Sequence, residues 1–248
     1  MNKGVSVKIL NLGCGSKVSG HPDVINLDWS PLLRLRRNPA LRAISPLLLN
    51  GERRERYKVL PLNILAHDIS KGLPFKSQTV DVIFHSHFLE HLDRSVVPNF
   101  LRETRRVLKT GGIHRLVVPN FAVACLAYVS HLEKCYSSEH EAARHDSFIA
   151  DILEQSVRRD AHGTSKQKSI RRIIETWILG DARQRGETHQ WGYDRINLKV
   201  LLADAGYSSP TVRGFNNSSI PMWQSYGLEQ SSDGSEYKPD SLYFESIK

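Results

Sequence analysis

The sequence predicts an α/β fold with a doubly wound, mostly parallel sheet of seven strands, interrupted by helical segments. Short apolar runs without strict alternation recur through the first half of the chain, which is typical of parallel strands buried on both faces. Helix-like segments separate these runs, as a series of βαβ units requires. The chain has 248 residues, of which 40% are hydrophobic and 24% charged, enough apolar material for the core of one domain.

The predicted strands end at polar or turn-forming residues. Five lie in the first half of the chain, and two near the C-terminus complete the sheet. They cover residues 7–12, 24–27, 62–66, 80–84, 116–118, 211–215 and 242–247.

Helical spacing of apolar residues predicts a helix from Asp93 or Ser95 to Leu108, with Ser95 as a cap and Lys-Thr-Gly-Gly after it. A second helix is predicted over 198–205. Two longer segments interrupt the alternation of strands and helices. Residues 31–58 and 121–190 are both expected to be helical inserts in a single domain that spans residues 1–248.

Positive charge is concentrated in two segments of the chain. The formal net charge is +8, from 34 Lys and Arg against 26 Asp and Glu. Residues 34–58 contain eight basic and two acidic side chains, and residues 158–185 contain eight basic and three acidic ones. Such clustering favours an anionic partner, for example a nucleotide, a phosphorylated substrate, a nucleic acid or a membrane surface. A solvated basic face is the alternative.

The cysteines and the N-terminus predict a cytoplasmic protein with reduced thiols. Cys14, Cys125 and Cys135 form neither a disulfide framework nor a zinc-knuckle spacing. No apolar run approaches the ~18 residues of a membrane span, and the N-terminus lacks the features of a signal peptide. Contact of the leucine-rich basic insert with an anionic membrane surface is left open.

A glycine-rich turn, Gly13-Cys14-Gly15, closes the first predicted strand. Such a turn lets backbone N–H groups approach a ligand at the N-terminus of a helix. The dinucleotide fingerprint G-x-G-x-x-G is incomplete, because Val18 stands at the third glycine position. Asp28, at the end of the second strand, is placed to accept hydrogen bonds from ribose hydroxyls. The carboxyl ends of parallel strands are where α/β sheets bind ligands.

Five motifs occur in order between about residues 7 and 120. They are L-G-C-G at 12–15, L-D at 27–28, H-D-I with L-P-F at 67–75, D-V-I with L-E-H-L at 81–92, and R-x-L-K-x-G-G at 106–112. Together they resemble the class I S-adenosylmethionine-dependent methyltransferases, in particular the small-molecule type with the L-E-H-L signature. The segments 189–194 and 241–243 are similar to members found in polysaccharide and secondary-metabolite gene clusters.

The resemblance implies a Rossmann-like methyltransferase fold with S-adenosyl-L-methionine as cofactor. It implies in-line methyl transfer to a small-molecule or glycan acceptor, for instance an anionic one with a sugar or metabolite hydroxyl. The implied cofactor residues are Asn11, Gly13, Cys14 and Gly15 at the methionine and ribose, Asp28 and Trp29 at the ribose, Asp68 and Ile69 at the adenine, and His85 beside the methionine. Lys17 departs from the family pattern, in which many members have a third small residue.

An oxygen nucleophile benefits from a general base, and histidine is the natural base near neutral pH. His87 is the first candidate because it follows the fourth strand at the ligand-facing edge, and His189 is the second. His91 is interpreted as structural. The 121–190 insert is expected to cover the acceptor. The candidates for anion contacts are Arg34, Arg36, Arg37, Arg53, Arg54 and Arg56.

Three other functions are left open by the residues alone. The basic charge allows an RNA or other nucleic-acid methyltransferase. A non-catalytic cofactor-binding protein would need the same glycine-rich turn. A metal-dependent hydrolase could use His85, His87 and His91 as ligands, whereas the methyltransferase interpretation expects no metal. The oligomeric state is not predicted.

Overall fold

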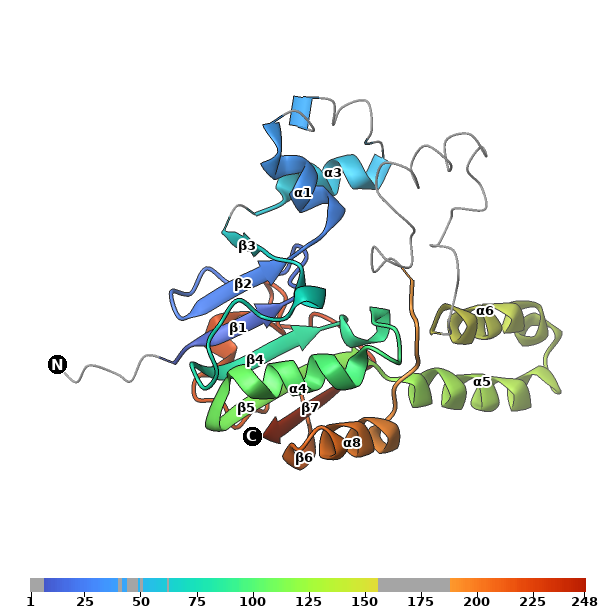
Figure 1. Ribbon diagram of the computed structural model, residues 1–248. Helices are drawn as coiled ribbons and strands as arrows, with labels where there is room; N and C mark the ends of the chain where they lie inside the picture. The colour runs from blue at the N-terminus through green and yellow to red at the C-terminus, as the bar shows by residue number, and fades with distance from the viewer. Residues whose placement is uncertain (1–6, 40–41, 44–48, 50, 62, 156–187) are drawn as a thin grey trace.

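The computed structural model describes residues 7–39, 42–43, 49, 51–61, 63–155 and 188–248. Its strands form a seven-stranded sheet in the order β3-β2-β1-β4-β5-β7-β6 (Figure 1). Strand β7 is antiparallel to β5 and β6, and the other pairs are parallel. The predicted fold class is confirmed. The strands are β1 Ile9–Leu12, β2 Val24–Asp28, β3 Ile64–Ala66, β4 Val80–Ser86, β5 Leu108–Pro119, β6 Ser208–Arg213 and β7 Ser241–Ile247.

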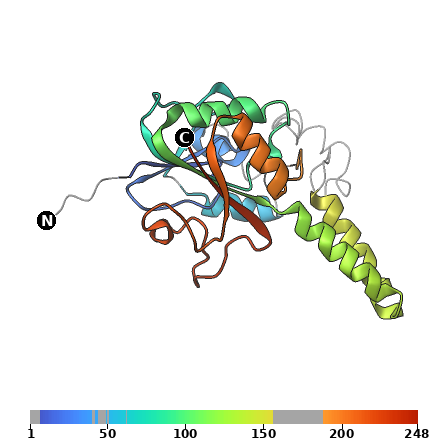
Figure 2. The same cartoon turned by 90° about the horizontal axis from the view of Figure 1, so that it is seen from below.

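Helices cover one face of the sheet, and the other face is covered mainly by the irregular 214–240 segment (Figure 2). Helices α5 and α6 form a hairpin that projects from the sheet. The rest of the predicted 121–190 helical segment, residues 156–187, lies outside the described residues. The helices are α1 Pro31–Arg37, α3 Gly51–Val59, α4 Val97–Val107, α5 Phe121–Cys135, α6 Glu139–Gln155 and α8 Arg195–Asp204, with 3-10 turns η1 Ile69–Lys71, η2 Leu89–His91 and η4 Trp223–Tyr226.

Helix α4 packs its apolar side against the centre of the sheet. Phe100 and Leu101 join Leu10 and Leu12 of β1 in the main core cluster. Fully burying one such side chain stabilises a fold by about 1.5–3 kcal/mol. The predicted Ser95 cap is wrong, because α4 begins two residues later and its N-cap makes no side-chain hydrogen bond.

A buried ion cluster attaches the 214–240 segment to the opposite face. Arg115 on β5 is completely buried. Its guanidinium donates to both carboxylate oxygens of Glu229, at 2.7 and 2.6 Å, and to Glu245 on β7 at 2.7 Å. The Trp223 indole N–H donates to the same Glu229. Because these charges are paired and hydrogen-bonded, the cluster fixes one arrangement of the segment.

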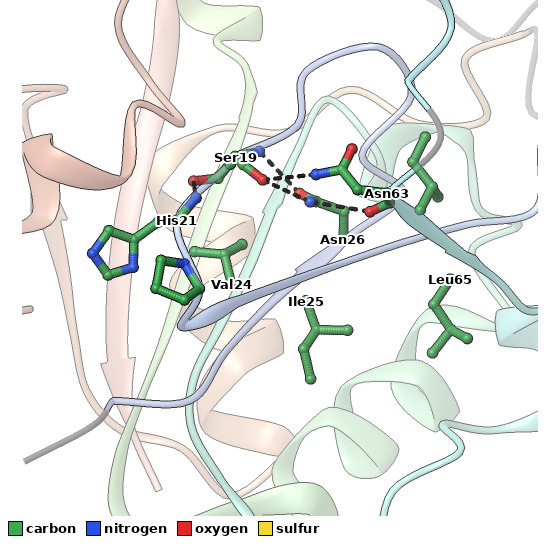
Figure 3. Close-up of a pocket in the computed structure, with 10 residues that line it drawn as sticks. Ser19, His21, Val24, Ile25, Asn26, Asn63 and Leu65 are labelled. Atoms are coloured by element: carbon green, nitrogen blue, oxygen red, sulfur yellow. Dashed lines mark hydrogen bonds between the residues drawn. The ribbon is translucent and has the colours of Figure 1, made fainter.

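The connection from β1 to β2 contains no helix, so the expectation of a helix N-terminus after the glycine-rich turn is wrong. Residues 13–23 are held instead by side-chain amides. The Asn26 side chain accepts from the Ser19 N–H and donates to the Ser19 carbonyl, and Asn63 donates to that carbonyl as well (Figure 3). These residues, with His21, border an open pocket of about 380 Å³. Long-range polar contacts therefore replace the helix.

Several predicted boundaries are also corrected. Strand β5 extends far upstream of residue 116, because 109–112 join it through a bulge opposite β4. Helix α8 begins at Arg195, because Asp194 and Asn197 form a capping box there. Strand β3 begins at Ile64 rather than at residue 62, which is itself outside the described residues. Among the described residues, no helix is long and apolar enough to cross a membrane.

Candidate active site

A pocket of about 410 Å³ opens where the strand order reverses, between β1 and β4. In open α/β sheets, ligands bind at this switch point, beyond the carboxyl ends of the strands. The volume is in the range of small-molecule sites. The lining residues are Asn11, Gly13, Cys14, Gly15, Ser16, Lys17, Phe84, Ser86, His87, His91, His189, Tyr237 and Lys238.

Both glycines of the turn have a left-handed backbone, with φ of +60° at Gly13 and +53° at Gly15. The ring of Phe88 lies so close to Gly13 that an added Cβ would sit 2.2 Å from it. At Gly15 an added Cβ would meet nothing within 4 Å. Gly13 is thus required for close packing and Gly15 only for its backbone conformation. Burial raises the pKa of the Cys14 thiol between them, which keeps it protonated.

Asp28 orders the glycine-rich turn from the end of β2. It is 7% exposed, and its carboxylate accepts hydrogen bonds from the Gly15 N–H at 2.5 Å and the Ser30 N–H at 2.6 Å. Burial raises the pKa of Asp28, and these two hydrogen bonds oppose that rise. The result is a poorly hydrated carboxylate beside the pocket, which is a strong acceptor for a ligand hydroxyl.

Three titratable side chains meet at the other side of the pocket. His87 has a left-handed backbone, with φ of +49°, and its Nδ1 lies 3.6 Å from Oε1 of Glu90. His91 Nε2 lies 3.9 Å from the same oxygen. The Ser241 hydroxyl lies 2.8 Å from His87 Nε2. A non-glycine residue at positive φ is uncommon and marks strain that the surroundings must hold in place.

Burial sets the protonation of this cluster. It raises the pKa of Glu90, which is 1% exposed, to about 8. It lowers the pKa of His87 to about 3 and that of His91 to about 4. At neutral pH the carboxyl therefore keeps its proton and both imidazoles are neutral. Neither carboxyl oxygen of Glu90 has a hydrogen-bond partner in the described part of the chain.

The segment 188–191 brings a third histidine to the same cluster. Its backbone is anchored by the Gln190 N–H, which donates to the Glu90 carbonyl at 2.6 Å, and by His91 Nδ1, 3.1 Å from the Thr188 carbonyl. The rings of His91 and His189 lie 4.9 Å apart, edge to face. The two histidines singled out in the sequence as candidate bases, His87 and His189, thus both line the pocket.

Other expected cofactor residues lie away from this pocket. Trp29 is 41% exposed and lies under Arg34. Asp68 caps η1 by accepting from the Ser70 N–H, and Ile69 lines a separate pocket of about 240 Å³ beside α4. His85 is completely buried on the α4 side of the sheet, with its Nε2 3.0 Å from that of His114.

The three histidines of the hydrolase alternative are consequently not brought together. A different group is assembled, in which ligand atoms of Glu90, His91 and His189 lie within 4.8 Å of one another. Because His85 contacts His114 in the core, it cannot share an ion with His87 and His91.

Sequence reasoning missed several residues at the pocket. Glu90 was treated only as part of the L-E-H-L signature, although its position three residues after His87 is a signal for an interacting pair. Lys17 and Lys238 both line the pocket, and the Lys17 ammonium lies 4.4 Å from the centre of the Tyr237 ring. Residues 237–238 lie in a predicted loop, and no sequence pattern indicates that this loop lies beside the glycine-rich turn.

Two arginines of the basic insert, Arg36 and Arg37, have structural contacts. Arg36 donates to the backbone carbonyls of Tyr57 and Leu60, and Arg37 donates to that of Ile64. These hydrogen bonds attach α1 to α3 and to the edge strand. The side chains of Arg53 and Arg56 lie outside the described residues, so their expected role is untested.

Comparisons with known proteins concern the class of protein to which the chain is similar. Residues 41–116 match the family model described as a methyltransferase domain. These residues therefore resemble part of a methyltransferase domain, and the match covers less than a third of the chain. A search among curated proteins found no significant match.

The chain is also similar to solved structures at low sequence identity. A SAM-dependent methyltransferase from Archaeoglobus fulgidus matches with 13% identity and a TM-score of 0.42, over 98% of this chain and 86% of that one. The corresponding protein from Mesorhizobium loti matches with 12% identity and a TM-score of 0.43, over 100% and 94%. One from Methanosarcina mazei has 16% identity and a TM-score of 0.43, over 98% and 93%.

The residues present fit the cofactor at two points. Gly15, which faces open space, leaves room for a ligand to approach the backbone of the turn. Asp28 offers a buried carboxylate beside it, as recognition of adjacent ribose hydroxyls requires.

Proposed function

We propose that the enzyme transfers the methyl group to a hydroxyl of an anionic small-molecule or glycan acceptor, with His87 as general base. The observation that carries the proposal is the contact of His87 with Glu90 at the edge of the pocket. S-adenosylmethionine supplies an electrophilic methyl group when bound. The protein's own task is to orient the hydroxyl and to receive its proton.

Burial keeps His87 neutral, so that one ring nitrogen is unprotonated at neutral pH. If Nδ1 carries the ring proton toward Glu90, Nε2 is the atom that accepts the proton of the acceptor hydroxyl. The Ser241 hydroxyl at 2.8 Å marks the direction in which that lone pair points. The ionised form of Glu90, which is reached as the pH rises through about 8, would stabilise the imidazolium.

Two lysines support an anionic acceptor. Lys17 and Lys238 line the same pocket as His87, from the first turn and from the segment before β7. An ammonium group binds a phosphate or carboxylate as a point charge. His189 would contribute a second polar contact from the end of the 121–190 segment, which we interpret as part of the acceptor side of the site.

The experiment is a screen of nucleotide sugars, sugar phosphates and hydroxylated carboxylic acids, with S-adenosylhomocysteine formation as readout. On the best acceptor, His87→Gln is expected to lower kcat by about 10²–10⁴-fold without weakening S-adenosylhomocysteine binding. His67→Gln is the control, because His67 bonds the Gly72 carbonyl away from the pocket. Wild-type turnover by His87→Gln, or transfer only to nucleic acid, would overturn the proposal.

A further inference from the structure

The α5–α6 hairpin contains a second cluster of titratable side chains, separate from the pocket. His131 and Cys135 are four residues apart on α5 and therefore share one face of the helix. His145 faces them from α6. His131 is the most buried side chain of α5, 4% exposed, whereas the apolar Leu126 and Val129 of the same helix are 67% and 54% exposed. The contact between these helices is thus centred on a polar group.

The potential ligand atoms are spaced as they would be around a metal ion. Nδ1 of His131 lies 3.0 Å from Nδ1 of His145 and 3.4 Å from Sγ of Cys135. All three atoms lie within 4.8 Å of one another. In a tetrahedral zinc site, bond lengths of about 2.0–2.1 Å to nitrogen and 2.3 Å to sulfur put neighbouring ligand atoms about 3.4–3.6 Å apart. The two distances from His131 are within a few tenths of an ångström of that spacing.

A carboxylate fixes the tautomer that metal binding needs. Nε2 of His131 lies 2.9 Å from Oε2 of Glu141, so the ring proton is on Nε2 and the lone pair is on Nδ1. Histidines that bind metals almost always donate their other N–H to such a partner. Both Cys135 and His145 approach that single lone pair. The Cys135 thiol also lies 3.3 Å from the His131 backbone carbonyl, which is its alternative acceptor. A cation at this point would contact all three ligand atoms.

We propose that His131, Cys135 and His145 bind one zinc ion that clamps α5 to α6, with Glu141 orienting His131. Water completes the coordination. Binding displaces the thiol proton of Cys135, because the thiolate is the metal ligand. The site is distinct from the methyl-transfer pocket and does not depend on the proposed acceptor.

The test uses the full chain, freed of metal by a chelator and titrated with cobalt(II). A thiolate ligand gives a near-ultraviolet charge-transfer band, which ions bound at the Glu90, His91 and His189 group cannot produce. We expect one equivalent of cobalt to saturate the band and zinc to displace it. Cys135→Ser should abolish it, and Cys125→Ser, on the same helix, should retain it. His145→Ala should weaken cobalt binding independently of the thiol.

Glu141, which contacts His131 rather than the metal, allows a second test in which binding is weakened but not abolished. Glu141→Gln is expected to lower zinc affinity by about 10- to 100-fold while the band keeps its shape. Zinc should also protect Cys135, but not Cys125, from alkylation. A wild-type protein without the band, or an alkylation rate of Cys135 that zinc leaves unchanged, would leave Cys135, His131 and Glu141 as a hydrogen-bonded group and overturn the proposal.

Discussion

Replacing Glu90 by glutamine should stabilise the protein at alkaline pH while impairing its activity. The amide has the shape of the protonated carboxyl but cannot ionise. Burial raises the pKa of Glu90 from 4.5 to about 8, so the folded protein holds a proton that the unfolded chain releases above pH 4.5. The stability from this proton is fully present below pH 4.5 and is lost as the pH rises through 8.

The size of the effect follows from the shift. One pKa unit corresponds to about 1.4 kcal/mol. Keeping Glu90 protonated in the folded protein, while it ionises in the unfolded chain, therefore lowers the folding stability by about 4 kcal/mol at pH 8 and about 1 kcal/mol at pH 5. Glu90→Gln removes this cost. Urea unfolding of both proteins at pH 5 and pH 8 measures it, and we expect the variant's advantage to grow by about 3 kcal/mol between these pH values.

Glu103→Gln is the matched control. A hydrogen bond from Arg106 lowers the pKa of Glu103, so its contribution has the opposite sign and is lost as the pH falls. That variant should gain nothing at pH 8. If Glu90→Gln and wild type show parallel pH dependence, Glu90 ionises normally in the folded protein and its assigned role in the His87 pair is wrong.

The remaining predictions concern the turn and the buried ion cluster. Gly13→Ala should lower both Tm and cofactor affinity, because the new Cβ displaces the Phe88 ring. Gly15→Ala should cost only about 1–2 kcal/mol of backbone strain. Differential scanning calorimetry measures the loss of Tm in each variant, and equal losses would contradict the packing argument. Arg115→Met should destabilise the fold by about 3–5 kcal/mol in urea unfolding, because Glu229 and Glu245 would lose their buried partner. A loss of unfolding free energy below about 1 kcal/mol would show that water reaches the cluster.

The sheet was predictable because its signals are local. Apolar runs that end at polar or turn-forming residues located β1, β2 and β4 to within a few residues. The capping box that starts α8 three residues before the predicted helix was missed. The β1–β2 connection was not predictable, because Asn26 and Asn63 replace the expected helix through contacts between distant positions.

In the candidate site, too, some positions could be predicted from the sequence and others could not. Gly13 and Gly15 follow β1 and Asp28 ends β2, so their neighbourhood could be inferred from the sheet alone. His85 and His87 are two residues apart and would share a face of a continuous strand. Strand β4 ends at Ser86, and the positive φ of His87 turns its side chain to the pocket while His85 stays in the core. A backbone reversal of this kind leaves no pattern in the sequence.

The central claim is that the turn at β1 and Asp28 form the cofactor site of a methyltransferase. Calorimetric titration with S-adenosylmethionine and S-adenosylhomocysteine, with NAD as a negative control, tests it most directly. We predict micromolar binding of the first two, no binding of NAD, and at least tenfold weaker binding by a folded Asp28→Ala variant, because the variant loses the carboxylate that orders Gly15. Unchanged affinity in Asp28→Ala, or binding of NAD alone, would contradict this placement of the cofactor.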